Sequence, residues 1–566
     1  MGPALRLTLS RVGVRSEAAG GSAIPPSRDG FTSRAATRGN SRRSEPARVE
    51  ATGKVALRLP GGMPQGLPGA NFGLSSAAGC RYKRGMKNRA STSLLLALAL
   101  PAAPVLGAAA GPLALHPDNP HYFLFRGQPA VLVTSGEHYG AVLNRDFDYV
   151  KYVDALAKDG LNLTRTFVGS YVEPSGAFNI AQNTLAPATG RFICPWARSD
   201  TPGYANGGNR FDLTRWDDAY FARLKDFVKQ AGKRGVVVEV NLFCPFYEET
   251  QWKLSPQNAA NNVNGIGTVA RTNVYTLDRH GGLLAVHEAL ARKLVTELNA
   301  FDNVYYEICN EPYFGGVTRE WQHHIADVIA AKEKSLANQH LISRNVANGS
   351  AKIDHPHPAI SIFNFHYAYP PDAVGMNFAL NKVIGDNETG FRGTNDLPYR
   401  AEAWHFMLAG GGLYNNLDYS FTVGHEDGTF VYPAKQPGGG NPAFRRQIGA
   451  LKRFIESFDF LRMQPLPNAP TPAPGFNTRV LVEPGRACAV YVSRSLDDKK
   501  PPAAPADQTV VVALDLPAGT YQVEWLNPVT GVKTKRPKIK HGGGYLRLDS
   551  PSFRDDVALK AVRTGK

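Results

Sequence analysis

The stretch that decides the fold is residues 304–312, which read Val-Tyr-Tyr-Glu-Ile-Cys-Asn-Glu-Pro. Its apolar and aromatic start predicts a buried strand, and Pro312 ends that strand. Residues 382–390, Lys-Val-Ile-Gly-Asp-Asn-Glu-Thr-Gly, form a second strand pattern that ends in a carboxylate. The strands of a parallel barrel bring their carboxyl ends to one face. We therefore expect Glu311 and Glu388 to face each other across a barrel mouth.

Outward from these two strands, short apolar runs alternate with stretches of helical period between residues 111 and 464. The pattern predicts helices over 147–157, 216–232, 283–298 and 321–331. It predicts strands over residues 131–134, 161–167, 236–243, 303–309, 341–346, 360–366, 382–385 and 412–417. Eight strands that alternate mostly with helices favour an α/β fold, a (β/α)8 TIM barrel.

The pattern changes after the barrel. Residues 465–474 form a Pro-rich linker, and residues 475–566 hold short strands separated by turns rich in Gly, Pro, Asn and Asp. Because no helical period remains there, this part is expected to be a small antiparallel β-sandwich.

The amino-terminal part has a different composition. Residues 86–110 follow the order of a secretory signal peptide: basic residues, then a short apolar run, then Ala108-Ala-Ala. Residues 1–85 are rich in Arg, Gly, Ser and Pro, which predicts a disordered extension or a start codon placed too early. The mature protein is thus expected to be secreted or periplasmic, with no membrane partner.

The net charge of +16 is unevenly distributed. Residues 1–110 carry 16 Lys and Arg against 4 Asp and Glu, so the remaining chain is close to neutral. This distribution argues against a nucleic-acid partner for the mature protein. The oligomeric state is not indicated.

Two long connections, 168–213 and 244–281, follow strands and so belong to the same face as Glu311 and Glu388. Trp196 and Trp252 in these connections either stack on sugar rings or pack the loops themselves. Glu137 and His138, at the end of the first strand, either reach a ligand or cap the strand.

Other acids compete with the two strand-end glutamates. Glu307 lies four residues before Glu311, or ~13 Å lower along the strand, so it is expected inside the barrel and paired with a base. Asp386 and Glu402 are alternative acids of the seventh strand. Histidines occur at 323–324 and at 355 and 357 without suitably placed partners, so neither a metal nor a cofactor is predicted.

These motifs resemble those of glycoside hydrolase family 5 and of the apiosidase-like barrels, whose carboxylates lie on strands four and seven. Asn310-Glu311-Pro312 is similar to the acid/base motif, Glu388-Thr-Gly to the nucleophile strand, and 160–165 to a strand that carries a supporting arginine. The carboxy-terminal part resembles a sandwich labelled collagen-binding that often follows such barrels.

The resemblance implies a role for each matching residue. Glu311 would be the general acid/base, with a pKa that needs raising, and the charge of Glu388 is one way to raise it. Glu388 would be the nucleophile, kept ionised by Arg165. Asn310 would hold the sugar 2-hydroxyl, and His366 and Tyr367 would complete the surroundings of Glu388.

Three positions depart from the family pattern. His366 and Tyr367 are adjacent, with Tyr369 as a competing residue. Asn241 stands where a histidine is common, and Tyr414, Asn415, Asn416 and Asp418 follow strand eight in place of a tryptophan. The departures at Asn241 and after strand eight leave the reaction type unchanged but put a cellulase assignment in doubt.

The sequence thus predicts a retaining glycoside hydrolase that cleaves O-glycosidic bonds of poly- or oligosaccharides by double displacement. The alternative is a catalytically inactive carbohydrate-binding protein on a barrel scaffold. A metal-dependent hydrolase is a third reading.

Overall fold

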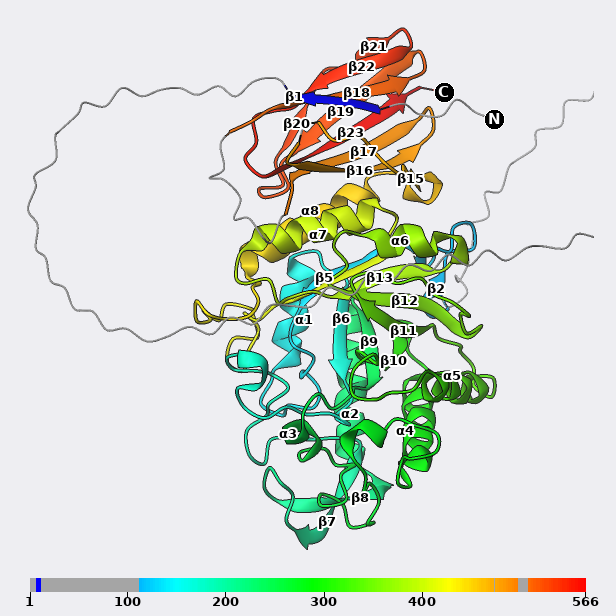
Figure 1. Cartoon of the computed structure of the whole chain (residues 1–566), viewed down its shortest axis with the longest axis vertical. Helices are drawn as coiled ribbons and strands as arrows, with labels where there is room; N and C mark the ends of the chain where they lie inside the picture. The colour runs from blue at the N-terminus through cyan, green and yellow to red at the C-terminus, as the bar shows by residue number, and fades with distance from the viewer. Residues whose placement is uncertain (1–6, 12–110, 473, 497–506, 566) are drawn as a thin grey trace, which may run out of the picture. The chain divides into compact units, whose positions relative to one another are not determined.

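The computed structural model describes residues 7–11, 111–472, 474–496 and 507–565. The predicted signal peptide, 86–110, and the predicted extension, apart from Leu7–Arg11, lie outside the described residues. Leu7–Arg11 forms strand β1, which pairs antiparallel with β18 (Val510–Leu516). Figure 1 shows the helices and strands in their order along the chain.

Eight parallel strands form the barrel, as predicted. They run in the order β5, β14, β13, β12, β11, β10, β9 and β6. The two end strands are joined by Asn162, whose side chain bonds the backbone N of Val133 and the O of Val131 at 2.9 Å each. Their bounds are β5 (Leu132–Gly136), β6 (Leu163–Phe167), β9 (Val237–Phe243), β10 (Val304–Cys309), β11 (Ile342–Asn348), β12 (Ile360–His366), β13 (Val383–Glu388) and β14 (Leu413–Leu417).

Amphipathic helices cover the barrel, and most begin at a residue that caps them. Asp148 accepts hydrogen bonds from the first backbone N–H groups of α1, and Asp217, Thr318, Asn395 and Asn441 do the same for α2, α5, α7 and α8. Such caps satisfy N–H groups that the helix itself leaves open. The helices are α1 (Tyr149–Lys158), α2 (Asp218–Lys233), α3 (Glu249–Trp252), α4 (Leu283–Leu298), α5 (Arg319–Glu333), α6 (Asp372–Asn377), α7 (Asp396–Leu408) and α8 (Pro442–Glu456).

The amino-terminal end of the barrel is closed by apolar side chains. A small antiparallel sheet of β2 (Ala114–Leu115), β3 (Phe123–Phe125) and β4 (Gln128–Ala130) lies there. Phe123 packs with Leu132, Tyr305 and other residues from the starts of the barrel strands in one buried cluster. Any ligand must therefore enter from the carboxyl ends of the strands.

The long connections after β6 and β9 are more structured than loops. The first contains a hairpin of β7 (Trp196–Pro202) and β8 (Asn209–Trp216), and the second contains α3. No helix in the described part of the chain is both long and apolar enough to cross a membrane.

Two antiparallel sheets follow the barrel, as predicted. They enclose a second core that includes Val490, Val512 and Trp525. One sheet holds β15 (Gln464–Pro465), β16 (Phe476–Glu483), β17 (Ala487–Arg494), β23 (Asp556–Thr564), β19 (Gly519–Leu526), β20 (Lys533–Lys535) and β21 (Ile539–His541). The other holds β1, β18 and β22 (Gly544–Asp549).

The sandwich is bound to the barrel through α7. Arg400 on α7 forms a buried ion pair with Asp556 at 2.7 Å, and the Tyr491 hydroxyl donates to the same carboxylate at 2.8 Å. Trp404 stacks on Tyr491 with ring centroids 5.0 Å apart. A buried ion pair and a buried aromatic pair fix the two parts as one folded body.

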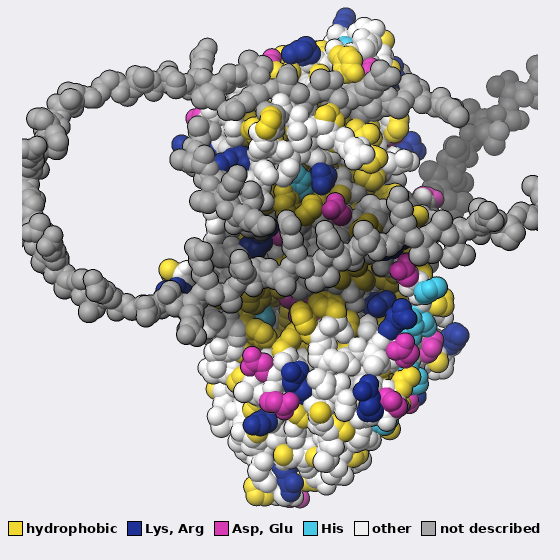
Figure 2. All heavy atoms as spheres, in the orientation of Figure 1, with side chains coloured by type: hydrophobic (Ala, Val, Ile, Leu, Met, Phe, Trp, Pro, Cys, Tyr) yellow, Lys and Arg dark blue, Asp and Glu magenta, His cyan; other side chains and the backbone are white. Residues whose placement is uncertain are grey.

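On the face shown in Figure 2, Lys and Arg are interspersed with Asp and Glu over the lower part of the molecule. This mixture agrees with the near-neutral charge of the chain after residue 110.

The Arg400–Asp556 pair gives a stability prediction. Arg400→Met leaves Asp556 buried without its cation, which costs about 3–5 kcal/mol. We expect a lower urea midpoint for the whole chain, measured together by tryptophan fluorescence and circular dichroism.

The matched control is Arg554→Met, which breaks the exposed Arg554–Asp507 pair in the same sandwich. Exposed pairs contribute about 0–1 kcal/mol, so the control midpoint should stay close to that of the wild type. Equal midpoints for both variants would show that the buried pair does not hold the interface.

Candidate active site

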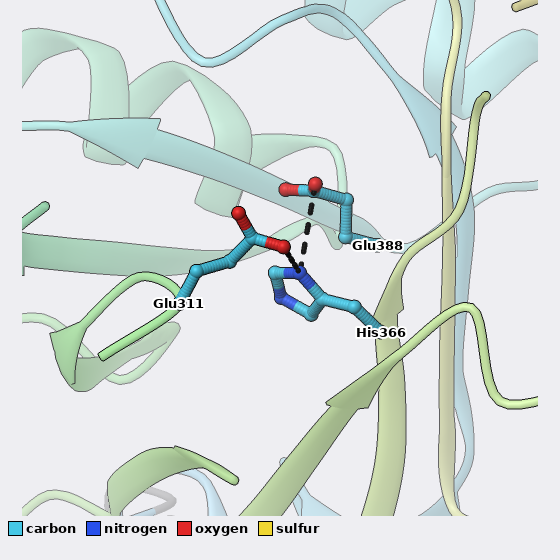
Figure 3. Close-up of side chains that lie close together, drawn as sticks. All are labelled: Glu311, His366 and Glu388. Atoms are coloured by element: carbon cyan, nitrogen blue, oxygen red, sulfur yellow. Dashed lines mark hydrogen bonds and ion pairs between the residues drawn. The ribbon is translucent and has the colours of Figure 1, made fainter. Parts of the chain in front are cut away.

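Glu311, His366 and Glu388 meet at the carboxyl end of the barrel (Figure 3). Glu388 is the last residue of β13, His366 is the last of β12, and Glu311 comes two residues after β10. His366 Nδ1 lies 3.1 Å from Glu311 Oε1 and 3.5 Å from Glu388 Oε1. One oxygen of each carboxylate and the histidine nitrogen all lie within 4.8 Å of one another.

Glu388 is surrounded by hydrogen-bond donors. The Tyr139 hydroxyl donates to Oε2 at 2.9 Å, and the Tyr367 hydroxyl donates to Oε1 at 2.8 Å. Arg165 Nη1 lies 3.2 Å from Oε2. Three hydrogen-bond donors thus converge on one buried carboxylate and fix its position.

Glu311 is held by a different set of donors. The Tyr247 hydroxyl donates to Oε2 at 2.7 Å, and the Tyr313 hydroxyl lies 3.1 Å from Oε1. Burial raises the pKa of Glu311, but the hydrogen bond and charge of His366, with the two hydroxyls, outweigh burial and hold the pKa below its ordinary value.

His366 shows the complementary effect. Burial lowers the pKa of His366, but the charge of Glu388 and the hydrogen bond to Glu311 raise it above its ordinary value. The imidazole of His366 thus contacts both carboxylates through its Nδ1. This arrangement differs from the expectation that the charge of Glu388 raises the pKa of Glu311.

Below this rim, Arg165 is the centre of a buried ionic cluster. Its Nε bonds Glu239 at 2.6 Å, and its Nη2 bonds Asn310 at 2.7 Å and also Glu307. Glu307 is fully buried and paired with a base, as its place along the strand predicts. Asn241 donates to Glu307 at 3.3 Å, so it supports the cluster and does not line the pocket.

The backbone around the rim is strained. Tyr139, Phe178, Glu311 and Tyr367 have φ angles of +61°, +54°, +34° and +52°. Side chains with a Cβ rarely adopt this left-handed region, and such residues cluster at functional sites. All four line the same pocket.

That pocket has a volume of about 530 Å³. Both glutamates open into it, and aromatic residues from several loops line its sides, among them Phe178, Phe314 and Phe391. These three phenylalanines are 39%, 44% and 41% exposed, so their rings are available to a ligand.

The structure shows whether the strand-end residues Glu137 and His138 and the two loop tryptophans line the pocket. Glu137 caps the turn after β5 by accepting from the backbone N of Gly140 at 2.9 Å and of Ala141 at 3.0 Å, whereas His138 lines the pocket. Trp196 and Trp252 are buried in the long connections and do not line the pocket. These two tryptophans therefore pack the loops, and the sugar-stacking alternative does not describe them.

The two alternative acids differ in their surroundings, because Glu402 lines the pocket and Asp386 does not. Asp386 is fully buried, and burial together with the charge of Glu402 raises its pKa well above the ordinary value. Glu402 accepts a hydrogen bond from Thr389 Oγ1 at 2.9 Å. A raised pKa disfavours the ionised form that a carboxylate nucleophile needs, which argues against Asp386 in that role.

Sequence analysis did not identify several residues that contact the two glutamates or the pocket. Tyr139 comes directly after Glu137-His138, and Tyr313 comes directly after Glu311-Pro312. Their positions next to strand ends could have identified them as site residues. Tyr247 and Glu173 lie in the two long connections, where no motif marks them in the sequence.

Glu311, His366 and Glu388 could in principle ligate a metal ion. The hydrogen bond of His366 to Glu311 and its ion pair with Glu388 account for the closeness of the three side chains, so the geometry does not require a metal.

Comparisons with known proteins agree with this geometry. Residues 150–385 match the family model of cellulase (glycosyl hydrolase family 5). A glycoside hydrolase from Bacteroides vulgatus superposes with a TM-score of 0.51 at 13% identity, over 80% of this chain and 83% of its own. A family 5 glycoside hydrolase from the same organism gives 0.51 at 14% identity, over 80% and 94%.

A further structure, described as a glycoside hydrolase, gives a TM-score of 0.52 at 13% identity, over 81% of this chain and 98% of its own. At these identities the structures show a shared fold. No curated protein matches the chain. The family match over residues 150–385 covers less than half of the chain, and together with the eight-stranded barrel it supports a glycosidase, an O-glycosyl hydrolase, on a TIM barrel similar to those of glycosyl hydrolase family 5.

Proposed function

We propose that the protein is a retaining glycosidase that cleaves poly- or oligosaccharides by two successive displacements. The observation that carries this proposal is the spacing of Glu311 and Glu388, whose nearest oxygens are within 4.8 Å. Retaining enzymes keep their two carboxyl groups about 5–5.5 Å apart, whereas inverting enzymes need about 6.5–9.5 Å for a water molecule. The close spacing favours the retaining mechanism.

In the first displacement, Glu388 attacks the anomeric carbon and Glu311 gives its proton to the departing oxygen. The C–O bond to the leaving group breaks as the bond to Glu388 forms. Tyr139, Tyr367 and Arg165 hold the carboxylate of Glu388 in place for the attack. In the second displacement, Glu311 takes a proton from water, which attacks the same carbon and releases Glu388.

Glu311 must be protonated to act as the acid, although His366 favours its ionised form in the free protein. Two features can restore the proton. A bound sugar excludes water, which strengthens the effect of burial, and the pair of Glu311 and His366 shares protons as a coupled unit. His366 therefore has the geometry to regulate the protonation of Glu311 during turnover.

We also propose that the mature protein is exported, on the signal-peptide pattern of residues 86–110. Amino-terminal sequencing of the protein from its natural host should give a start close to Gly111. A start within residues 1–85 would contradict the proposal.

Covalent trapping tests the assignment of the nucleophile. The protein is incubated in EDTA with 2,4-dinitrophenyl 2-deoxy-2-fluoro-β-D-glycosides of glucose, mannose and xylose, and its mass is measured. We expect one added fluoro-sugar on Glu388, located by peptide fragmentation. Glu388→Ala should take up no label and lose several orders of magnitude in kcat.

The control for trapping is Glu320→Ala, an exposed acid on α5, which should label like the wild type. Label on Asp386 or Glu402, or full turnover by Glu388→Ala, would contradict the assignment. An inactive carbohydrate-binding protein would gain no mass at all.

The pH profile tests the role of His366. His366→Gln removes a cation that lowers the pKa of Glu311, and burial, which raises that pKa, remains. Because the acid form of Glu311 is needed, the alkaline limb of kcat/KM should move to higher pH. The control is His324→Gln on the outer helix α5, which should leave the profile unchanged. A limb that stays in place, or moves to lower pH, would show that His366 does not control Glu311.

A further inference from the structure

His138 is a buried histidine whose hydrogen-bonding capacity is unused. It lies two residues after β5, lines the pocket and is 8% exposed. Neither ring nitrogen has a hydrogen-bond partner among the described residues. Buried polar groups are nearly always satisfied, so an unsatisfied group that faces a pocket is a place where a ligand is expected to bind.

Glu173 lies opposite this histidine. It follows β6 in the first long connection, is 4% exposed and lines the same pocket. His138 Nε2 is 3.4 Å from Glu173 Oε2, without the alignment of a hydrogen bond. The Tyr171 hydroxyl donates to Oε1 at 3.0 Å, and the Asn183 amide donates to Oε2. A carboxylate has about four acceptor positions, so Glu173 keeps capacity for a ligand.

The chain behind this pair is closely packed. The Thr184 hydroxyl donates to Glu137 at 2.6 Å, and the Asn144 amide donates to the Thr184 carbonyl at 3.1 Å. A Cβ on Gly140 would lie 2.2 Å from that carbonyl oxygen, so only glycine fits. Leu185 is 1% exposed and also lines the pocket. The loops after β5 and β6 therefore form a closed wall.

We propose that His138 and Glu173 form a subsite for the hydroxyl groups of a terminal neutral sugar ring. A sugar hydroxyl both donates and accepts, so one ring can donate to Glu173 and accept from the His138 N–H. Because this wall closes the pocket behind the pair, the proposal places the terminal ring here and no further ring beyond it. The enzyme then removes single sugars from the end of a glycan or glycoside, and does not cut inside a chain.

The charges around the subsite favour a neutral sugar. An anionic sugar acid would meet Glu173, and also Glu388, whose charge acts on His138. A cationic amino sugar would bring an ammonium group, which only donates, to the His138 N–H, so that two donors would face each other. A ring with hydroxyl groups alone satisfies both members of the pair.

This inference rests on the proposed function for the position of the scissile bond, but binding tests it without catalysis. The probes are 4-nitrophenyl 1-thio-β-D-glycosides of glucose, galactose, mannose and xylose, which resist hydrolysis. Their Kd for the full chain is measured by isothermal titration calorimetry. We expect at least one probe to bind, and His138→Leu and Glu173→Gln each to raise its Kd by about tenfold or more, as lost hydrogen bonds to charged groups do.

The matched control is the His324–Glu288 pair, in which Nε2 and Oε1 are 2.7 Å apart on the outer helices α5 and α4. His324→Leu and Glu288→Gln should leave the Kd unchanged. Circular dichroism and the urea midpoint confirm that each variant is folded. Unchanged binding in both folded pocket variants, or no binding of any probe to the wild type, would overturn the subsite.

A second measurement tests end-wise action. A β-linked hexasaccharide of the sugar that binds best, labelled at its reducing end, should lose one sugar at a time from the other end. Internal cleavage as the first event would overturn the closed-wall argument. If no glycoside is hydrolysed, the proposed function fails, but the calorimetry still decides whether His138 and Glu173 bind a sugar.

Discussion

The buried guanidinium of Arg165 is the interaction on which the barrel and its site depend. One cation on β6 contacts Glu239 on β9, Glu307 on β10 and Glu388 on β13. Three carboxylates around one cation cannot all be ionised at low cost in a dry interior. Burial and the charge of Glu307 raise the pKa of Glu239 to about 7, so part of the excess charge is removed by a proton at Glu239. Arg165 can therefore also form its ion pair with Glu388.

The amides around this cluster explain how the strands are kept in register. Asn387 on β13 donates to Glu239 at 3.0 Å and to Glu307 at 2.9 Å, and Asn364 on β12 donates to Glu307 at 2.7 Å. A slip of one residue would turn these amides toward the helices and leave the carboxylates unsatisfied. Polar pairing therefore specifies the barrel interior as strictly as apolar packing specifies its outer layer.

Apolar packing can be predicted from the sequence, whereas most of the polar contacts inside the barrel cannot. The spacing of apolar residues along the chain predicts all eight barrel strands and the observed bounds of α4. It also predicts the strand ends that carry Glu311 and Glu388. The residues that contact these glutamates are harder to predict. At the barrel rim, successive side chains no longer alternate between the two faces of a strand. The pairing of β12 with β13 is irregular at His366, and Glu311 and Tyr367 have positive φ angles. Trp196 and Trp252 show the same limit, since an aromatic residue in a long loop has the same sequence signal whether it faces a pocket or the loop's own core.

The sandwich influences the site through α7, although none of its described residues lines the pocket. α7 follows β13, the strand that ends in Glu388, and it carries Arg400 toward Asp556 and Glu402 toward Thr389. Helix α7 is therefore fixed on one side by an ion pair to the sandwich and on the other by a hydrogen bond next to Glu388. Because closely packed elements transmit small displacements, the position of Glu388 depends on a contact made in another part of the fold. This dependence gives the sandwich a structural role in the barrel, whatever else its outer surface binds.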